Sequence, residues 1–414
     1  GPLLAEALGT LVGSKELNAW VQISSSGQIT IYSSVPEMGQ GIKTALPMII
    51  AEEMGAKWDD VKVLKSDVDS ARFGLQGAGG STSIPRNFDS MRTMGASARE
   101  MLIGAASEAL EVDRAELEAK DSKVIHLSGE SLSFGALAAL AVRQPIPDPA
   151  TLSFKDPKAY TIIGTSIAGV DNLGIVLGQS QFGIDVDVPN MRYAAYTRCP
   201  RLGGVPISFN EQAIKALPGV LDAFILTPDA RAGQSSMSFL DGLAVLQGGV
   251  AIVGEDTWSV LNAKSNLKVV WDESAASTDS WSQMRREAKN LAGTAGGEIK
   301  RDSPVEAALN APSNKAIDAF YEFPYVAHIC MEPMNCTAQV FDDRCEIWVG
   351  TQNQGNDRTV VAKMLGLPET SVVINRTLMG GTFGRRASKT ADFITDTVQA
   401  AQGESVPVQI IWSR

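Results

Sequence analysis

Residues 28–54 read QITIYSSVPEMGQGIKTALPMIIAEEM, and this stretch decides the fold of the chain. Residues 28–35 form an apolar run of the length of a strand, and residues 43–54 repeat apolar side chains at helical spacing. The Gly39-Gln40-Gly41 turn joins the two directly. The stretch therefore predicts a strand, a glycine turn and a helix, which together make one unit of a mixed α/β lobe.

Two further segments have the same plan. One begins with a strand predicted at residues 61–64 and passes through the Gly-rich loop 76–81 into a long helical pattern. The other begins with a strand predicted at residues 371–378 and continues through MGGTFGRR at 379–386 into a helix that ends near residue 401. Strand, glycine loop and helix therefore occur three times.

The two ends of the chain also repeat each other. Residues 54–63 (MGAKWDDVKV) are similar to residues 365–374 (LGLPETSVVI), and each segment follows a predicted helix. Each of those helices follows a strand that ends in Gln-Gly, at Gln40-Gly41 and at Gln354-Gly355. Two copies are too few for a solenoid, so the repeat predicts a duplicated lobe.

The middle of the chain has a different pattern. Short β-rich runs alternate with helical patterns between residues 181 and 272, as in a compact α+β domain. Strands are predicted there at residues 192–197, 220–226, 249–253 and 267–271, and helices at 210–216 and 256–264. The predicted units are a first lobe (1–150), a linker (151–180), a central domain (181–275), a polar helical connector (276–314) and a second lobe (315–414).

Composition excludes several classes of protein. The chain has 414 residues, of which 44% are hydrophobic and 20% charged, as expected for a globular protein of two or more domains. The net charge is −11 and no Lys/Arg-rich run occurs, which argues against a nucleic-acid binder. No uncharged apolar stretch is long enough to span a bilayer. The chain begins at Gly1 and not at Met, so we expect either that a preceding segment, such as a signal, was removed or that the first residues are an artificial addition.

Cysteine and histidine are scarce. His328, Cys330, Cys336 and Cys345 lie close in sequence, but no C-x2–4-C pair occurs, so a zinc site is not predicted. We expect the cysteines to be small buried side chains on adjacent strands. The neighbouring segment 331–335 (MEPMN) offers one carboxylate without a partner, and a structural turn is expected there.

The glycine turns are the strongest chemical signal. A glycine turn that leads into a helix exposes unpaired backbone N–H groups at the positive end of the helix dipole, where anions bind. One such turn alone is usually just a tight turn, but three in an acidic protein favour a bulky anionic cofactor held by main-chain amides. There is no P-loop, no dinucleotide fingerprint and no nucleophile elbow. Hydrolysis of nucleoside triphosphates, Rossmann dehydrogenase chemistry and triad chemistry therefore lose support.

Five motifs together resemble one family. They are EMGQG (37–41), FGLQGAGGSTS (73–83), AH with MEPMNC (327–336), TQN (351–353) and MGGTFGRR (379–386). In this order they are similar to the molybdenum-binding large subunit of the xanthine dehydrogenase/aldehyde oxidase superfamily, in the branch of the isoquinoline 1-oxidoreductase β-subunit. The resemblance implies an α+β fold with duplicated molybdenum-cofactor lobes that flank an α/β hammerhead-like domain.

The resemblance also assigns site residues. It implies that the turn 38–41 and the loop 76–83 hold a molybdopterin cytosine dinucleotide, that Gln352 lies near the molybdenum oxo ligand, and that Phe383 belongs to the catalytic loop beside the metal. No side chain is assigned as a metal ligand. The residues assigned to the cofactor are Met38, Gly39, Gln40, Gly41, Gln76, Gly77, Gly79, Gly80, Ser81, Thr82, Ser83, Gly380, Gly381, Thr382, Gly384 and Arg385.

Two features depart from the family pattern. Thr382 stands where the family usually has glycine, and a β-branched residue disfavours positive φ, so an altered turn or a narrowed pocket is expected. The chain also ends at Arg414, before the Gly-rich motif that carries the family's catalytic glutamate. We therefore expect the catalytic base to lie in a further C-terminal part of the subunit.

The implied reaction is hydroxylation of an aldehyde or N-heteroaromatic substrate with water as the oxygen source. Electrons would pass to a small subunit with two [2Fe–2S] clusters and on to a membrane-bound c-type cytochrome that carries haem c. The implied location is the periplasmic face of the cytoplasmic membrane, with the cytoplasm as the alternative. Two other functions remain open: a non-catalytic paralogue that acts as a scaffold or cofactor-binding module, and a soluble module that binds a free nucleotide.

Overall fold

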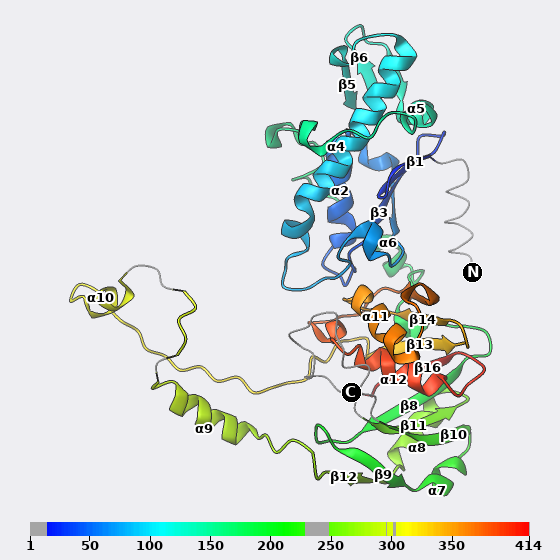
Figure 1. Cartoon of the computed structure of the whole chain (residues 1–414), viewed down its shortest axis with the longest axis vertical. Helices are drawn as coiled ribbons and strands as arrows, with labels where there is room; N and C mark the ends of the chain where they lie inside the picture. Colours follow the sequence, from blue (N-terminus) through cyan, green and yellow to red (C-terminus); the bar gives the residue numbers. More distant parts are fainter. Residues whose placement is uncertain (1–14, 228–247, 295, 301–303, 414) are drawn as a thin grey trace.

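The computed structural model describes residues 15–227, 248–294, 296–300 and 304–413. The first 14 residues of the predicted first lobe and residues 228–247 of the predicted central domain lie outside the described residues. Figure 1 shows the first lobe above a second body, with a long arm that projects to one side. Within the described part of the chain, no helix has the length and apolar character needed to cross a membrane.

The first lobe contains a four-stranded sheet in the order β1-β2-β3-β4. The strands are β1 (Lys15–Asn18), β2 (Val21–Ile23), β3 (Ile29–Ser33) and β4 (Val61–Lys65). The first three pair antiparallel, whereas β3 and β4 are parallel and are connected by α2 (Ile42–Met54). The predicted strand, glycine turn and helix are therefore confirmed, and β3 ends three residues before Pro36, whose missing N–H cannot join the ladder.

Helix α4 (Ser83–Leu110) packs across α2 and begins directly after the Gly-rich loop. Their crossing depends on Gly95, because a Cβ there would lie 2.5 Å from the carbonyl oxygen of Ile50 and 2.8 Å from the Cβ of Glu53. The short helix α3 (Ser70–Phe73) precedes the loop. The helices α2 and α4 contribute many of the side chains of the apolar core of the first lobe.

A small extension continues from the far end of α4, at the top of Figure 1. It contains β5 (Leu117–Lys120), β6 (Lys123–His126) and β7 (Ser131–Ser133) as one sheet, followed by α5 (Phe134–Ala141). The chain then runs back along the lobe to α6 (Asn172–Val176). Glu52, which is fully buried in α2, holds this return segment by accepting bonds from the backbone N–H groups of residues 161–163.

The central domain and the second lobe share one seven-stranded sheet, in the order β10-β11-β8-β16-β13-β14-β15. The last strand of the chain, β16 (Val408–Ile411), joins them because it pairs parallel with β8 and antiparallel with β13. The remaining strands of the sheet are β8 (Arg192–Arg198), β10 (Val220–Leu226), β11 (Gly249–Gly254), β13 (Asn335–Val340), β14 (Cys345–Val349) and β15 (Val372–Arg376).

Helices cover this sheet in two groups. The helices α7 (Glu211–Lys215) and α8 (Thr257–Ser265) pack beside β8, β10 and β11, whereas α11 (Gln354–Leu365) and α12 (Asp392–Ala401) pack beside β13, β15 and β16. A separate ribbon pairs β9 (Val205–Phe209) with β12 (Val269–Asp272). The predicted helices and strands of the central domain are confirmed, apart from shifts of one or two residues at their ends.

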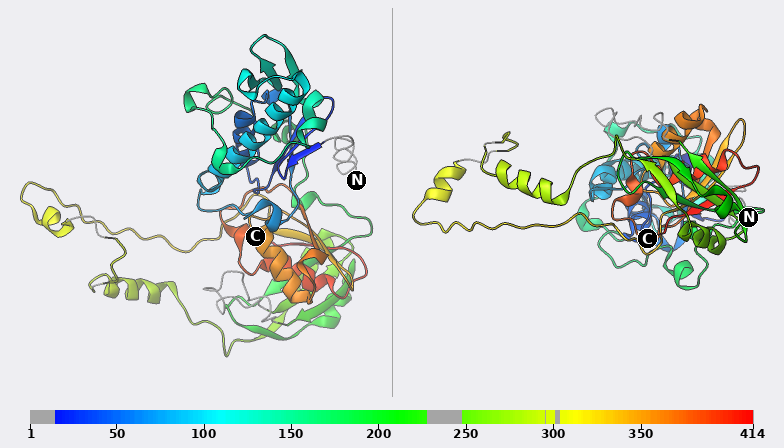
Figure 2. Two further views of the ribbon diagram at one scale, coloured as in Figure 1. Left: turned by 45° about the horizontal axis from the view of Figure 1, so that its top comes forward. Right: turned by 90° about the horizontal axis from the view of Figure 1, so that it is seen from below.

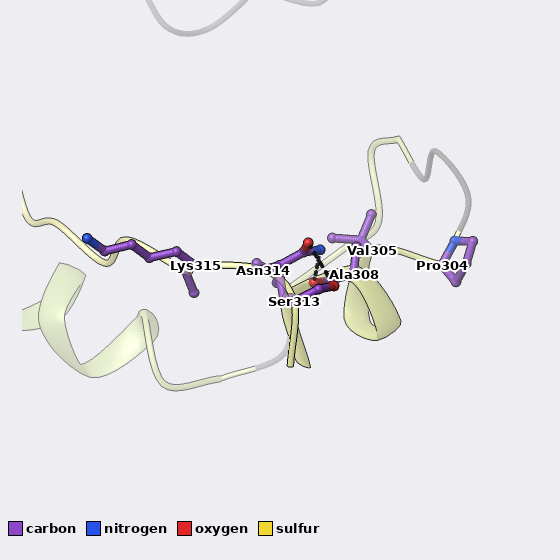
Figure 3. A pocket seen from close by; sticks show the side chains of 8 residues that line it. Pro304, Val305, Ala308, Ser313, Asn314 and Lys315 are labelled. Carbon is purple, nitrogen blue, oxygen red and sulfur yellow. Dashed lines mark hydrogen bonds between the residues drawn. The ribbon is translucent and has the colours of Figure 1, made fainter. Parts of the chain in front are cut away.

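The arm carries α9 (Trp281–Leu291) and α10 (Val305–Asn310), and neither helix has a buried residue. Both views in Figure 2 show it extending away from the two bodies. A hollow of about 690 Å³ lies beside α10 and is closed on one side by a hydrogen bond of 2.8 Å from Asn314 Nδ2 to the Ala308 carbonyl (Figure 3). It is lined mainly by small and apolar side chains and lies far from the glycine turns.

Gly95→Ala should destabilise the first lobe. Alanine raises helix propensity by about 1 kcal/mol, but its Cβ cannot fit against the Ile50 carbonyl without moving α2 away from α4. We expect a net loss of about 1–3 kcal/mol in the free energy of unfolding, measured by urea denaturation. Ser90→Ala, at an exposed position of the same helix, is the control and should be nearly neutral. Equal stability of the Gly95→Ala variant and the parent would contradict this packing.

Candidate functional site

The turn after β3 is closed by its own carboxylate. Gly39 and Gly41 adopt positive φ values of 97° and 83°, which orients the backbone N–H groups of the turn inward. The Glu37 carboxylate accepts hydrogen bonds from Gly39 N (2.7 Å), Gly41 N (3.0 Å) and Lys43 N (2.9 Å). The sequence predicted that these backbone amides bind an external anion. In the structure they are instead bound to the carboxylate of Glu37.

The side chain of Gln76 organises the second loop. It is 1% exposed, and its Nε2 donates to Ser66 Oγ (2.9 Å) and to the Asp67 carbonyl (2.7 Å), while its Oε1 accepts from Asp69 N (2.7 Å). All its hydrogen-bonding groups are thus used within the lobe. Gln76 shapes the loop and leaves contact with a ligand to its neighbours.

The end of the same loop is open. Residues 79–82 are exposed, and Gly80 and Ser81 have positive φ values of 59° and 56°. Thr82 precedes α4 but makes no side-chain capping bond, so the first amides of this long helix have no side-chain partner from the cap. This helix end retains the unpaired N–H groups that favour an anion.

The second and fourth motifs meet across the two lobes. Ala78 N donates to the Gln352 carbonyl (2.9 Å), and Gln352 Nε2 donates to the Ala78 carbonyl (3.0 Å). Gln352 is 4% exposed, and its Oε1 is buried without a hydrogen-bond partner in the described structure. A buried acceptor of this kind costs free energy unless something donates to it, so Gln352 has one position available for a bound group.

The loop 380–386 packs against the first turn. Thr382 is 3% exposed and its Oγ1 lies 2.9 Å from the sulfur of Met38. Positive φ values fall on Gly381 (102°), Phe383 (50°) and Gly384 (91°), and Thr382 is not among the positive-φ residues. The turn therefore accommodates threonine without the strain expected from the sequence. Phe383 takes the unusual conformation, and its side chain is 72% exposed.

A buried ion pair fixes this loop. Arg386 is fully buried, and its Nη2 donates to Glu332 Oε2 at 2.9 Å. The same carboxylate accepts from Gly380 N (2.7 Å), Ile184 N (3.0 Å) and Asn335 Nδ2 (2.8 Å). One carboxylate thus joins the MEPMN segment, the glycine loop and the chain that enters β8.

The side chain of Arg385 does not contact Glu332 as Arg386 does; it pairs with another carboxylate. Its guanidinium forms a bidentate pair with Asp392 (2.9 and 2.7 Å), and Arg198 binds both Asp392 and Asp396. Trp412 lies under the two guanidinium groups. Burial raises the pKa of Asp396 to about 7, although Arg198 acts in the opposite sense. In this arrangement Arg385 is a structural donor to Asp392.

The three glycine-rich motifs and the TQN motif therefore lie at the junction of the lobes, joined by the Met38–Thr382 and Ala78–Gln352 contacts. A cavity of about 200 Å³ opens beside the first turn. Its lining is Glu37, Gly39, Gly41, Lys43, Thr44, Gly169, Val170, Asp171, Asn172, Ile175, Phe182, Leu378 and Met379. The predicted residues 76–83 and 380–385 do not line this cavity, so the structure brings the motifs together without placing all of them around one cavity.

All four cysteines are free and buried, which confirms their interpretation as small buried side chains. Cys336 and Cys345 lie on the adjacent strands β13 and β14. In the described part of the chain, no cluster of three or more His, Cys, Asp or Glu side chains could hold a metal ion.

Sequence reasoning missed the role of Glu332, because the MEPMN segment was expected to be only a turn. The available signal was Arg386 in the last motif, the natural partner for a lone carboxylate. Gly380 and Gly183 were further signals, since a Cβ would lie 2.5 Å from Glu332 Cβ at the first position and 2.2 Å from Asn335 Oδ1 at the second.

Comparison with known proteins gives matches to molybdopterin cofactor-binding domains and to subunits of oxidoreductases. Two family profiles, both described as molybdopterin cofactor-binding domains, match residues 5–172 and 286–414. The chain is 28% identical to isoquinoline 1-oxidoreductase subunit beta of Brevundimonas diminuta, over 96% of this chain and 54% of that protein. It is 28% identical to the membrane-bound aldehyde dehydrogenase (pyrroloquinoline-quinone) of Gluconacetobacter polyoxogenes, over 97% of this chain and 51% of that protein.

Among solved structures, quinoline 2-oxidoreductase from Pseudomonas putida 86 aligns with a TM-score of 0.45 and 20% identity, over 60% of this chain and 34% of that one. The chain spans about half the length of the two curated relatives.

Glu332→Gln should destabilise the second lobe strongly. The change leaves the fully buried Arg386 without its counter-charge, a loss of about 3–5 kcal/mol in the free energy of unfolding. Glu346→Gln, which removes a more exposed ion pair on β14, is the control and should cost about 0–1 kcal/mol. Adding Arg386→Met to Glu332→Gln should restore part of the loss in chemical denaturation. A Glu332→Gln variant as stable as the control would refute the proposed role of the pair.

The buried carboxyl of Asp357 gives a pH dependence. Asp357 is 1% exposed and accepts a bond from the Thr351 hydroxyl, next to Gln352. Burial raises its pKa from 3.8 to about 8, although the bond from Thr351 lowers it. The folded chain therefore holds a proton that the unfolded chain releases between these values, and the free energy of unfolding falls as pH rises through this window.

Asp357→Asn should reduce this fall, because asparagine cannot lose the proton. Urea unfolding at about pH 5, 6.5 and 8 measures the slope, and each unit of pKa shift corresponds to about 1.4 kcal/mol. Asp396 contributes a remaining slope below its pKa of about 7. Asp343→Asn, at an exposed site, is the control. An unchanged slope in Asp357→Asn would show that Asp357 is already ionised in the folded chain.

Proposed function

The chain belongs to the molybdopterin cofactor-binding large subunits of the xanthine dehydrogenase/aldehyde oxidase family, in the branch that includes isoquinoline 1-oxidoreductase subunit beta, and we propose that it is a cofactor-binding part of a molybdenum hydroxylase. The proposed substrate is an aldehyde or an N-heteroaromatic compound, the classes named in its relatives. The observation that carries the proposal is the meeting of the three glycine-rich motifs and the TQN motif at the lobe junction.

The residues at this junction fit a molybdopterin group in two respects. Gln352 Oε1 is a buried acceptor without a partner, suited to an N–H donor of the pterin, whereas an oxo ligand would need the Nε2 group that already donates to the Ala78 carbonyl. The exposed residues 79–82 leave the N-terminus of α4 open, as the phosphates of a cytosine dinucleotide form require. When bound, the cofactor would supply a redox metal that makes water reactive near neutral pH.

The chain's own residues would position and enclose the bound cofactor. The reciprocal Ala78–Gln352 bonds hold the two lobes in register, and the Glu332–Arg386 pair keeps the loop 380–386 in place beside Met38. Thr382 fills the space between the loop and the first turn. These contacts orient Gln352, whereas the general base is proposed to lie in a further part of the subunit.

The electron-transfer partners are part of the proposal. One relative, isoquinoline 1-oxidoreductase subunit beta, is named as a subunit, which supports a partner subunit that we propose carries [2Fe–2S] clusters. The four cysteines here are buried and free, so the clusters would belong to that partner. A c-type cytochrome and a place at the periplasmic face of the membrane are proposed as well; the name of the membrane-bound relative supports a membrane but not one face of it.

One observation favours the alternative of a non-catalytic paralogue that acts as a scaffold. The Glu37 carboxylate already occupies the amides of the first turn, so an anion can bind there only if Glu37 moves. In a scaffold Glu37 would simply cap α2. Molybdenum content distinguishes the two functions.

The purified complex of the full-length subunit with its partners should contain about one molybdenum and release about one cytidine monophosphate per large subunit, by elemental analysis and chromatography. Gln352→Leu should lower molybdenum retention after dialysis by about tenfold or more, because a buried hydrogen bond is worth about 1–3 kcal/mol. Gln402→Leu, at an exposed position, is the control. Absence of molybdenum from the parent complex would refute the enzyme and leave the scaffold.

A further inference from the structure

Three cationic side chains converge between the lobes from three separate elements. Lys43 lies in the first turn of α2, Lys65 is the last residue of β4, and Arg376 is the last residue of β15. All three line one small cavity, together with Ser33, Thr351 and the carboxylate of Glu37. None of the three cationic residues belongs to the motifs that carry the family resemblance.

Two of these cations lack a counter-charge. Lys43 pairs with Asp171, but no carboxylate of the described residues lies within ion-pair distance of Lys65 or Arg376. Lys65 Nζ donates to the Arg376 carbonyl (3.2 Å), and Arg376 donates to the carbonyls of Ser34 and Ser66. Carbonyl bonds satisfy the donors without neutralising the charge, and a buried cation without a partner is costly.

A second, independent observation points to a ligand in this cavity. Ser33 is 2% exposed, and its Oγ has no hydrogen-bond partner in the described structure. Buried hydroxyls are almost always bonded, and this one lines the same cavity as the two unpaired cations. A group that accepts from a hydroxyl and carries negative charge would satisfy all three side chains.

We propose that Lys65, Arg376 and Ser33 form a subsite for a phosphate-class anion at the junction of the lobes. Arginine and lysine are the usual donors to phosphoryl oxygens, and a buried anion gains more from them than an exposed one does. If the anion is a phosphate of the bound cofactor, the subsite rests on the proposed function. A free phosphate or phosphorylated ligand has the same chemistry and does not depend on it.

The cavity is small and can be reached from a larger neighbouring cavity. It measures about 10 Å³, room for about one water, and it shares Glu37, Lys43 and Met379 with the neighbouring cavity of about 200 Å³. An anion entering from the larger cavity must pass Glu37, whose charge is held by three backbone amides. Binding should therefore shift the side chains of Glu37 and Lys65 to widen the subsite.

The protonation of Lys65 agrees with this geometry. Burial lowers its pKa to about 8, and repulsion by Lys43 and Arg376 acts in the same direction, while Asp171 opposes it. Burial also lowers the pKa of Arg376 to about 10. A bound anion would raise the pKa of Lys65 again, so binding near pH 8.5 should take up a proton from solution.

The test uses the full-length subunit in its complex, prepared without molybdenum cofactor, and inorganic phosphate as the probe. Phosphate at constant ionic strength should raise the melting temperature relative to chloride. Calorimetry at about pH 8.5 in two buffers of different ionisation enthalpy should show proton uptake by the parent protein. Lys65→Met should weaken phosphate binding by about tenfold or more, since a charge-assisted bond is lost.

Lys62→Met is the matched control, because Lys62 lies on the same strand and faces the opposite side of the sheet. It should keep the full response to phosphate. The proposal is overturned if the cofactor-free parent shows neither a phosphate-dependent shift nor proton uptake. It is also overturned if both lysine variants respond like the parent. The parent's proton uptake remains decisive even if Lys65→Met does not fold.

Loading the cofactor distinguishes the two sources of the anion. Loss of the phosphate response in the molybdenum-loaded complex supports a cofactor phosphate in the subsite, and a retained response supports a separate phosphorylated ligand. A complex that never contains molybdenum but binds phosphate through Lys65 would refute the proposed enzyme and leave this subsite standing.

Discussion

The buried ion pair between Glu332 and Arg386 is the constraint on which the second lobe depends. Two charges removed from water must find their hydrogen-bond partners inside the protein, and here the partners belong to different parts of the chain. Gly380 and Ile184 donate to the carboxylate, while the Gly350 carbonyl accepts from the guanidinium. The loop that resembles the metal-facing loop of the family can therefore adopt only the arrangement that satisfies this pair.

The internal repeat is used differently at its two ends. In the first lobe the Gln-Gly turn precedes α2, and the neighbouring Glu37 closes the helix N-terminus from inside. In the second lobe Gln354 begins α11, and its side chain crosses the junction to the Ser34 carbonyl at 3.1 Å. Duplication thus gives two turns of similar sequence, of which one is capped locally and the other ties the lobes together.

Local sequence patterns predicted local structure well and long-range contacts poorly. The strand, turn and helix over residues 28–54 follow from apolar spacing and glycine, and both are visible in a short window. The insertion of β16 between β8 and β13 is not, because strand pairing depends on partners far away in sequence. For the same reason the motifs indicated which loops meet, but they did not predict that the Glu37 carboxylate would accept the hydrogen bonds of the backbone amides in the first turn.

The net charge of the chain also hid the most informative electrostatics. A charge of −11 argues against a polyanion on the surface, yet Lys65 and Arg376 place unpaired positive charge inside the lobe junction. A surface average says nothing about a desolvated site, where a few groups at short range determine the potential. An acidic protein can therefore bind an anion, provided that cations without ion-pair partners converge where the two lobes meet.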